Sequence, residues 1–550
     1  MVVCFQLDPD PLRYILFFFG FKLWRLISQE RLAAFAVMAA SIVLTRSQEF
    51  LYRTFSHQEF AIAIVFAGIY FFYRERFLLA ATLLGIAANF NALYSIYPMF
   101  YFTVYLIWQH KKHGWKILLQ SIGLYLLVAL PFIVWNVQKF IAHQGIPQPG
   151  PQEWIPLFML ACPQNFLFKE IPLDLILKDY KVALLALRPY LALVSLYLLN
   201  QVFHPKFRQD RKIQAIAFSV TVLLVLSFVF SYIRPIRFVV DLNMVRNTQF
   251  LFYFLMGYTG LWVIRTCRQE QSFWGLLTVS AYSLLYLDDI IKLLSIGFLI
   301  FLTATIRTGK AGMRPSSLVA ALMWGALAVA CAAGIWKMSR LLNYDFKVID
   351  QWAYVTGILL LLSLTTLLRL RWAHFPELKN YFILIPIAAM FCSFISLHSH
   401  YLKSVKNNEG FWALQNSWED MQRYVRDHTP KNAYILAPND MEMGGFRILS
   451  ERKILVCYRD CGIIGFDYQA AKEWQRRLKD VEAFKVLLDK NQDLGAALLK
   501  AVQSYKVNYV VFMRYYAPPA GVLGFAKIYE NDHFSLFEVK MNPVPQADGP

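Results

Sequence analysis

Charged residues are scarce in this sequence of 550 residues. They make up 17% of the chain, whereas hydrophobic residues make up 57%. Soluble domains usually contain about 25% charged and about 45–50% apolar residues. A soluble core of this size would not need so many apolar side chains. The composition therefore argues against an ordinary soluble protein and predicts one that spans a lipid bilayer.

Motifs of common soluble enzymes are also missing. None of the seven cysteines has the paired C-x-x-C spacing of a zinc site. The C-terminal part contains neither a GxGxxG nor a Walker motif, and it shows no catalytic constellation. No cleavable signal peptide is evident, because Arg13, Lys22 and Arg25 interrupt the first apolar run. Cys457 and Cys461 form a C-x3-C pair that could close a local disulfide in an oxidising compartment.

Long apolar runs instead alternate with short basic turns up to about residue 400. A bilayer crossing needs about 20 residues, and on that length we predict a polytopic α-helical membrane protein with about 13–14 spans. The candidate spans lie near residues 11–27, 31–45, 60–73, 77–92, 94–109, 116–138, 181–202, 213–232, 249–265, 273–288, 291–306, 316–336, 351–371 and 379–398.

Basic turns follow every odd-numbered span, which predicts that these turns face the cytoplasm. They contain Lys22/Arg25/Arg31, Arg74/Arg76, Lys111/Lys112/Lys116, Lys206/Arg208/Arg211/Lys212, Arg265/Arg268, Arg307/Lys310/Arg314 and Arg369/Arg371. The net charge of +19 comes mostly from these turns, where basic residues set the orientation of the protein in the membrane. No nucleic-acid partner is therefore expected. The same counting puts residues 1–10 outside without a preceding span, and we expect a missing or misplaced start.

Residues 401–550 are more polar and predict a soluble α/β domain on the outer side. Helices are expected at 409–429, 470–484 and 494–505 from apolar residues at helical spacing. Strands are expected at 433–437, 454–457, 507–513 and 534–539 from short apolar, β-branched runs. Because strands and helices alternate, the domain should contain a small sheet covered by helices. Residues 1–400 form the predicted transmembrane domain.

Ionisable residues in the predicted outer loops are the candidates for chemistry, since charge next to lipid-buried helices usually has a use. The candidate catalytic residues are Asp8, Asp10, Glu49, His57 and Glu59, and the candidate substrate-binding residues are Arg237, Asp241 and Arg246. Each has a structural alternative. Paired acids often cap helices, a single histidine often only hydrogen-bonds at the interface, and arginines extend to lipid headgroups.

Three stretches resemble the GT-C superfamily of membrane glycosyltransferases, the clan of protein O-mannosyltransferases and aminoarabinose transferases, and are most similar to bacterial members of unassigned activity. They are Phe55–Pro98, Glu153–Phe168 and the tail WEDMQRYVRDHTPKNAYILAPNDMEMGGFRILSERK, with its pattern Trp…TP-x-x-A…P…FR…S-x-R. The resemblance implies an outward-facing active site and a polyprenyl-phosphate-linked sugar donor. It also implies an acidic first outer loop. Either Asp8 and Asp10 are the remnant of that loop, or the acidic residue is absent from this chain.

The expected function is therefore an integral membrane glycosyltransferase in a bacterial inner (plasma) membrane, with membrane lipids and the lipid-linked sugar as partners. An outer carboxylate would deprotonate the acceptor, and an arginine would stabilise the departing lipid phosphate. A transporter or flippase of a lipid-linked saccharide and a non-catalytic membrane scaffold stay open as alternatives. No metal ligands are predicted, although a divalent cation cofactor, the sugar, the acceptor and the oligomeric state are left open.

Overall fold

The chain divides into two compact units in a computed structural model. Unit 1 comprises Met1–Gln144 and Gln164–His398, and unit 2 comprises Gly145–Pro163 and Ser399–Pro550. The residues that the structure describes are 10–44, 57–142, 149–169, 171, 173–270, 282, 296–297, 299–300, 409–438, 445–465, 467–489, 502–514 and 525–539. The predicted spans beyond residue 270 lie almost wholly outside these residues.

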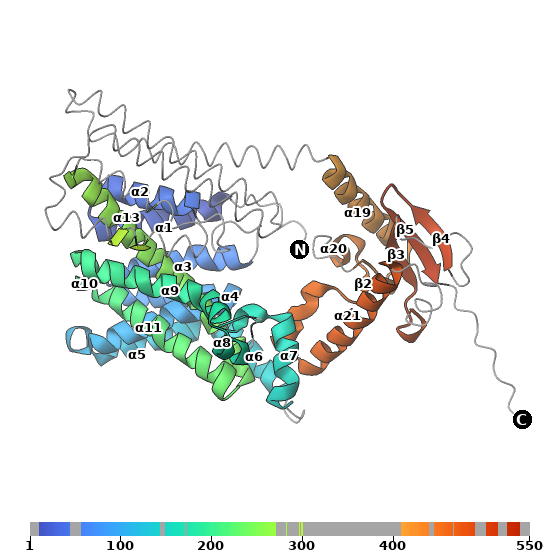
Figure 1. The fold of residues 1–550 in the computed structure, drawn as a ribbon, viewed down its shortest axis with the longest axis horizontal. Helices are drawn as coiled ribbons and strands as arrows, with labels where there is room; N and C mark the ends of the chain where they lie inside the picture. The colour runs from blue at the N-terminus through green and yellow to red at the C-terminus, as the bar shows by residue number, and fades with distance from the viewer. Residues whose placement is uncertain are drawn as a thin grey trace, which may run out of the picture. The chain divides into compact units, whose positions relative to one another are not determined.

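The described part of unit 1 is helical (Figure 1). Its α-helices are α1 (Asp10–Ser28), α2 (Arg31–Leu44), α3 (His57–Tyr73), α4 (Phe77–Trp108), α5 (His110–Val128), α6 (Leu130–Ala142), α8 (Leu173–Lys178), α9 (Tyr180–Phe203), α10 (Pro205–Gln209), α11 (Arg211–Phe228), α12 (Arg237–Asp241) and α13 (Thr248–Glu270). Shorter turns are η2 (Pro163–Asn165), η3 (Val229–Ile233) and η4 (Met244–Asn247).

Membrane-spanning character is confirmed at a coarser level than the sequence predicted. By length and composition, three described helical segments qualify as membrane-crossing candidates: α4, α9 and the continuous helix Arg211–Ile233. The pair α5 and α6, bent by 63°, makes a fourth if it is one span. The count of 13–14 spans stays a prediction.

Helix α4 is two antiparallel arms rather than one rod. Asn91 has extended backbone angles (φ −154°, ψ 100°) that break the helix. The ring centroids of Phe77 and Tyr105 lie 6.1 Å apart, whereas a straight helix would separate these residues by about 40 Å. The chain therefore reverses at Asn91, close to the boundary between the predicted spans 77–92 and 94–109.

The basic turns meet at one end of this bundle. Glu75 in the turn before α4 accepts an ion pair from Lys112 (2.8 Å) and a longer one from Lys212 (3.5 Å). Lys206 Nζ donates to the carbonyl of Ser28 (3.4 Å). Turns far apart in sequence are thus neighbours, as the predicted orientation requires of turns on one side of a membrane.

Aromatic side chains are the largest fully buried groups in the core of unit 1. Trp24 on α1 is fully buried, and its Nε1 donates to the hydroxyl of Tyr253 on α13 (2.8 Å). Gly257 lets these helices approach closely, because a Cβ there would lie 2.0 Å from the Trp24 ring. This contact fixes α13 against α1, so that the segment before α13 has a defined position.

Asn89 forms hydrogen bonds to the backbone on both sides of the break between α5 and α6. A continuous helix would pair the Phe132 N–H with the Val128 carbonyl. Here Asn89 Nδ2 donates to Val128 O (3.0 Å) and Asn89 Oδ1 accepts from Phe132 N (3.2 Å). Pro131, which lacks an N–H, is the second residue of α6, directly after the break at Ala129. The amide of Asn89 therefore bridges two backbone groups that the bend has separated.

Replacing Asn89 with leucine should destabilise unit 1, because two backbone groups would lose their partners in an apolar environment. We expect a loss of about 2 kcal/mol and a fall in melting temperature of roughly 4–8 °C. Thermal unfolding of the detergent-solubilised protein measures this. The matched control is Asn136→Leu, since Asn136 donates only to Phe132 O in its own helix (2.9 Å). Equal melting temperatures for both variants would contradict the bridging role.

Unit 2 contains a five-stranded mixed sheet with the order β2-β1-β3-β5-β4 (Figure 1). Its strands are β1 (Tyr434–Leu436), β2 (Lys453–Ile454), β3 (Tyr509–Met513), β4 (Phe525–Glu530) and β5 (Phe534–Val539). Strand β1 pairs in parallel with β2 and β3, whereas β5 is antiparallel to β3 and β4. The predicted α/β class of this domain is confirmed as a small mixed sheet with helices.

The helical elements of unit 2 are α7 (Pro151–Ala161), α19 (Glu409–His428), α20 (Phe446–Ser450), η7 (Tyr458–Gly465) and α21 (Tyr468–Asp489). The predicted helices 409–429 and 470–484 correspond to α19 and α21. Most of the predicted helix 494–505 lies outside the described residues. The sequence analysis missed β4, in which Lys527 and Glu530 interrupt the apolar residues and a bulge breaks the pairing.

Candidate functional site

The structure describes the side chain of none of the five candidate catalytic residues, and two of them lie wholly outside its described part. These two are Asp8 and Glu49. Asp10 begins α1, and His57 and Glu59 lie in the first turn of α3, but only their backbone is described. Their roles stay predictions. The three candidate substrate-binding residues, in contrast, all lie in the described segment between η3 and α13.

Arg237 and Asp241 are the first and last residues of the short helix α12. Residues four apart face the same side of a helix. Burial raises the pKa of the Asp241 carboxyl to about 6, and the positive charge of Arg237 opposes part of that rise. A carboxyl with this pKa takes up and releases protons close to neutral pH, as a general acid or base requires.

Arg246 lies in η4, where aromatic and amide groups position it. Its guanidinium carbon lies 5.7 Å from the ring centroid of Tyr94, so the cation lies over the ring face. In the orientation that satisfies its hydrogen bonds, the Asn243 amide accepts from Arg246 Nε (3.2 Å) and donates to the carbonyl of Gln164 (3.2 Å). Asn243 adopts a left-handed backbone (φ 49°) that asparagine tolerates well.

Polar groups from the bundle hold the backbone of this segment in place. The hydroxyl of Tyr97 donates to the carbonyls of Leu242 and of Asn243, the latter at 2.8 Å. Asn165 Nδ2 donates to Val240 O (3.2 Å). Tyr97 lies on the arm of α4 that begins at Asn91. The segment carrying Arg237, Asp241 and Arg246 is thus anchored near the reversal of α4, at the end away from the basic turns.

Two buried oxygens in the same region have no partner among the described residues. They are Oδ1 of Asn247 and Oε1 of Gln249. A buried amide oxygen without a hydrogen bond is costly, and such atoms often accept from water or a ligand. Donor hydroxyls, such as those of a sugar, suit these acceptors.

The sequence analysis missed the residues that support this segment. Tyr94, Tyr97, Asn165 and Asn243 have no motif in common, because they come from three separate parts of the chain. In the sequence, the aromatic residues around Tyr94 and Tyr97 do not differ from other residues of a predicted membrane span. Only the contacts identify them as supports for Arg246 and the backbone next to it.

Together these groups offer a cation, a carboxyl that titrates near neutral pH, and unpartnered acceptors. This set suits an anionic ligand with hydroxyl groups. Within the described residues, no group of three or more His, Cys, Asp or Glu residues is arranged to hold a metal ion. Whether Arg237 and Arg246 border a cavity open to the outer leaflet stays a prediction.

A cavity of about 360 Å³ lies at the opposite end, among the basic turns. His204, Lys206 and Arg265 contribute its positive side, and Glu30 its negative one. Burial lowers the pKa of His204 to about 4, and its Nδ1 accepts from Phe207 N (3.0 Å). His204 is therefore a neutral helix cap at pH 7, and this cavity contains none of the candidate residues.

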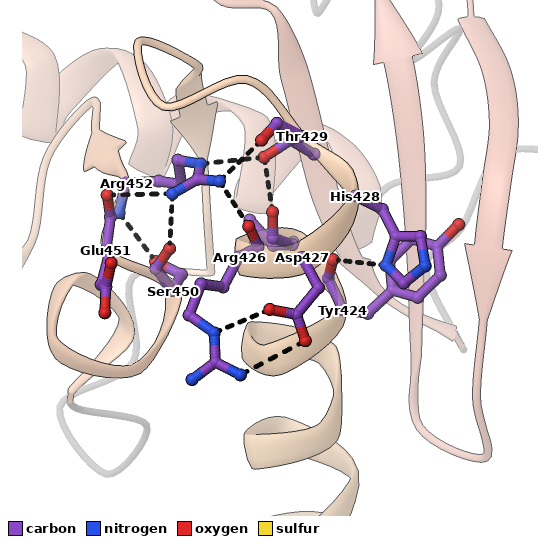
Figure 2. Close-up of polar contacts among 9 residues, drawn as sticks. Tyr424, Arg426, Asp427, His428, Thr429, Ser450, Glu451 and Arg452 are labelled. Carbon is purple, nitrogen blue, oxygen red and sulfur yellow. Dashed lines mark hydrogen bonds and ion pairs between the residues drawn. The ribbon is translucent and has the colours of Figure 1, made fainter.

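The S-x-R element of unit 2 has a structural role (Figure 2). Arg452, the last residue of the S-x-R element, is 5% exposed. Its guanidinium donates to Thr429 Oγ1 (3.1 Å), Thr429 O (2.6 Å), Ser450 O (3.2 Å) and the carbonyl of Arg426. Arg426 lies in the last turn of α19. The guanidinium thus satisfies carbonyls that every helix leaves unpaired at its C-terminus.

The FR element has a similar positioning role. Phe446 packs on Trp418, with ring centroids 5.2 Å apart, in the core beneath α19. Arg447 forms a bidentate ion pair with Asp460 of η7, and Asp460 also accepts from the backbone N–H of Cys457 (3.0 Å). These contacts order η7 and offer no catalytic group.

The comparisons with known proteins concern only part of unit 2. Residues 416–481 match a family described as a domain of unknown function (DUF6798). The matched segment begins before Trp418 and includes the Arg452 and Arg447 contacts, but it covers only a small part of the chain and none of unit 1. A comparison with curated proteins finds no match. The chain is thus similar to this family over residues 416–481 of unit 2.

Proposed function

We propose that this protein is an integral membrane glycosyltransferase of the GT-C type that uses a polyprenyl-phosphate-linked sugar. The observation that carries the proposal is the segment 237–249. It combines an arginine held over Tyr94, an aspartate with a pKa of about 6, and unpartnered amide oxygens. It is anchored at the end of the bundle away from the basic turns, where the donor headgroup would lie outside the cytoplasm.

In this mechanism Arg246 stabilises the phosphate that leaves with the lipid. An arginine binds phosphate through parallel, charge-assisted hydrogen bonds, and its planar group stacks on an aromatic ring at the same time. Asp241 takes the proton from the acceptor hydroxyl or amine as the new glycosidic bond forms. Asp8, Asp10, Glu49, His57 and Glu59 are the other candidates for this base, and Arg237 is a second phosphate ligand.

The finer topology belongs to the same proposal. Fourteen spans, with the basic turns after the odd-numbered spans in the cytoplasm, would place unit 2 outside the cytoplasm of a bacterium, attached to its inner membrane. A cysteine introduced at Lys479, on the exposed side of α21, tests this orientation. We expect it to react with a membrane-impermeant maleimide added to the outside of intact cells. Reaction only after the membrane is opened would overturn the topology.

A flippase for a lipid-linked saccharide is the second candidate, since it would also need a cation for the phosphate. The raised pKa of Asp241 favours the enzyme, because transport of an anion does not require a proton acceptor. The two are separated by a transfer assay with a polyprenyl-phosphate sugar and a mixture of membrane acceptors. Sugar transfer supports the enzyme. Movement of the lipid across the vesicle membrane without sugar transfer would support the flippase. If neither activity is detected, the result would support the non-catalytic scaffold.

Donor binding provides a sharper test of Arg246. Arg246→Ala should weaken the binding of a polyprenyl phosphate by roughly 10–100-fold, because a charge-assisted hydrogen bond contributes about 1.5–3 kcal/mol. Binding is measured on the detergent-solubilised protein by microscale titration. Arg208→Ala is the matched control, since Arg208 is an exposed arginine in a basic turn. Equal loss in both variants would mean that overall charge, rather than this site, governs binding.

A further inference from the structure

Helix α7 packs within unit 2, although its sequence lies between two helices of unit 1. Its buried residues are Trp154, Leu157, Phe158 and Ala161. Lys472 on α21 lies 3.8 Å from Glu153, and the Tyr458 hydroxyl of η7 donates to Leu160 O (3.5 Å). The inserted segment 145–163 is therefore held on the soluble domain by contacts along the length of α7.

Two cysteines meet at the end of this contact. Cys162 follows α7 directly, and Cys461 lies in the middle of η7. Their thiols hydrogen-bond to each other, and both side chains are half-buried. Cys457 lies only four residues before Cys461, but its side chain packs against the core of the domain. The partner of Cys461 is thus the distant Cys162 rather than the nearby Cys457.

Neighbouring contacts fix the position of Cys461. Asp460 is held by the two guanidinium nitrogens of Arg447. Trp474 Nε1 donates to the carbonyl of Cys457 (3.0 Å), which anchors the start of η7 to α21. The thiol–thiol contact therefore lies between two elements, α7 and η7, that are each packed independently of it. Closing a disulfide would bring these two hydrogen-bonded sulfurs to the bonding distance of about 2.05 Å.

We propose that Cys162 and Cys461 form a disulfide that fastens the inserted segment 145–163 covalently to the soluble domain. The oxidant is a disulfide of the compartment, either that of a thiol oxidoreductase or oxidised glutathione. Its reaction with two protein thiols balances as follows: one disulfide is reduced to two thiols while Cys162 and Cys461 lose two protons and two electrons. The inference does not depend on the proposed glycosyl transfer, which uses no sulfur.

The order of the steps follows from the thiol environment. The hydrogen bond from Cys162 lowers the pKa of Cys461 to about 7, although burial opposes that change. Cys461 is therefore the thiolate that attacks the oxidant, which forms a mixed disulfide and releases one thiolate. The Cys162 thiolate then attacks Sγ of Cys461 and releases the second. Protons from the two cysteines end on the two released thiols.

Peptide mapping of the full-length protein tests the pairing directly. Trypsin cuts after Arg459, so the three cysteines fall on separate peptides of residues 140–169, 454–459 and 460–472. The purified protein is incubated with oxidised glutathione, denatured in N-ethylmaleimide and digested without reductant. We expect a linked pair of peptides 140–169 and 460–472. Alkylation of Cys162 and Cys461 should fall together by about tenfold or more, and dithiothreitol should restore it.

Several outcomes would overturn the proposal. They are a linked pair of peptides 454–459 and 460–472, glutathione adducts without any linked pair, or full alkylation of all three cysteines. Two cysteine variants add a check that does not depend on the yield of linked peptides. Cys162→Ser should leave Cys461 open to alkylation, whereas Cys457→Ser should retain the linked pair. Because the wild-type map alone decides the pairing, a variant that fails to fold leaves the test intact.

Discussion

Replacing Arg452 with methionine is expected to unfold unit 2 locally. The methionine fills similar space but leaves the carbonyls of Arg426, Thr429 and Ser450 without their donor. A buried polar group that loses its partner costs about 1–3 kcal/mol, so we expect a total loss of roughly 3–4 kcal/mol. Amide hydrogen exchange in α19 and β1 of the full-length protein should then accelerate by about 10²–10³-fold.

Arg423→Met is the matched control for this prediction. Arg423 is also on α19, but its side chain is exposed and forms only a 3.5 Å ion pair with Glu419. Exposed pairs of this kind contribute less than about 0.5 kcal/mol, so exchange should hardly change. Peptides of α11 serve as an internal reference in both variants. Similar exchange in the Arg452 and Arg423 variants would show that the buried guanidinium is dispensable.

Replacing Asp241 with asparagine is expected to lower the rate of sugar transfer by about 10²–10⁴-fold, the usual contribution of a general base. The base acts only when it is deprotonated. Because the pKa of Asp241 is about 6, the wild-type rate should rise tenfold per pH unit below pH 6 and become constant above about pH 7. Asparagine cannot titrate, so the variant should lose this rise.

The control for Asp241 is Asp174→Asn in the loop helix α8. The Asp174 side chain is 72% exposed and has only a long ion pair with Lys178 (3.9 Å). The Asp174→Asn substitution removes the same charge from the same unit, and both the transfer rate and its pH profile should stay unchanged. If Asp241→Asn keeps the wild-type rate and the rise below pH 6, the base is another residue. Asp8, Asp10, Glu49, His57 and Glu59 would then be substituted singly.

The sequence by itself determined the local structure and the class of protein. Apolar residues at helical spacing predicted α19 and α21, and short β-branched runs predicted β1, β3 and β5. These signals are local, because each element buries one stripe or face of its own residues. The division of the chain near Asn91 was also predicted, since the 32 mostly apolar residues of α4 exceed the length of one bilayer crossing.

Only the tertiary structure decided which distant residues meet. It placed Tyr94 beneath Arg246, Asn89 between Val128 and Phe132, and Cys162 beside Cys461. It also assigned α7 to unit 2, although the sequence of that helix lies between the predicted spans 116–138 and 181–202. The physical reason is that an apolar helix face is satisfied equally by lipid or by protein, and a polar group by any partner within reach. Sequence periodicity shows that such a face exists, and only the folded chain determines what covers it.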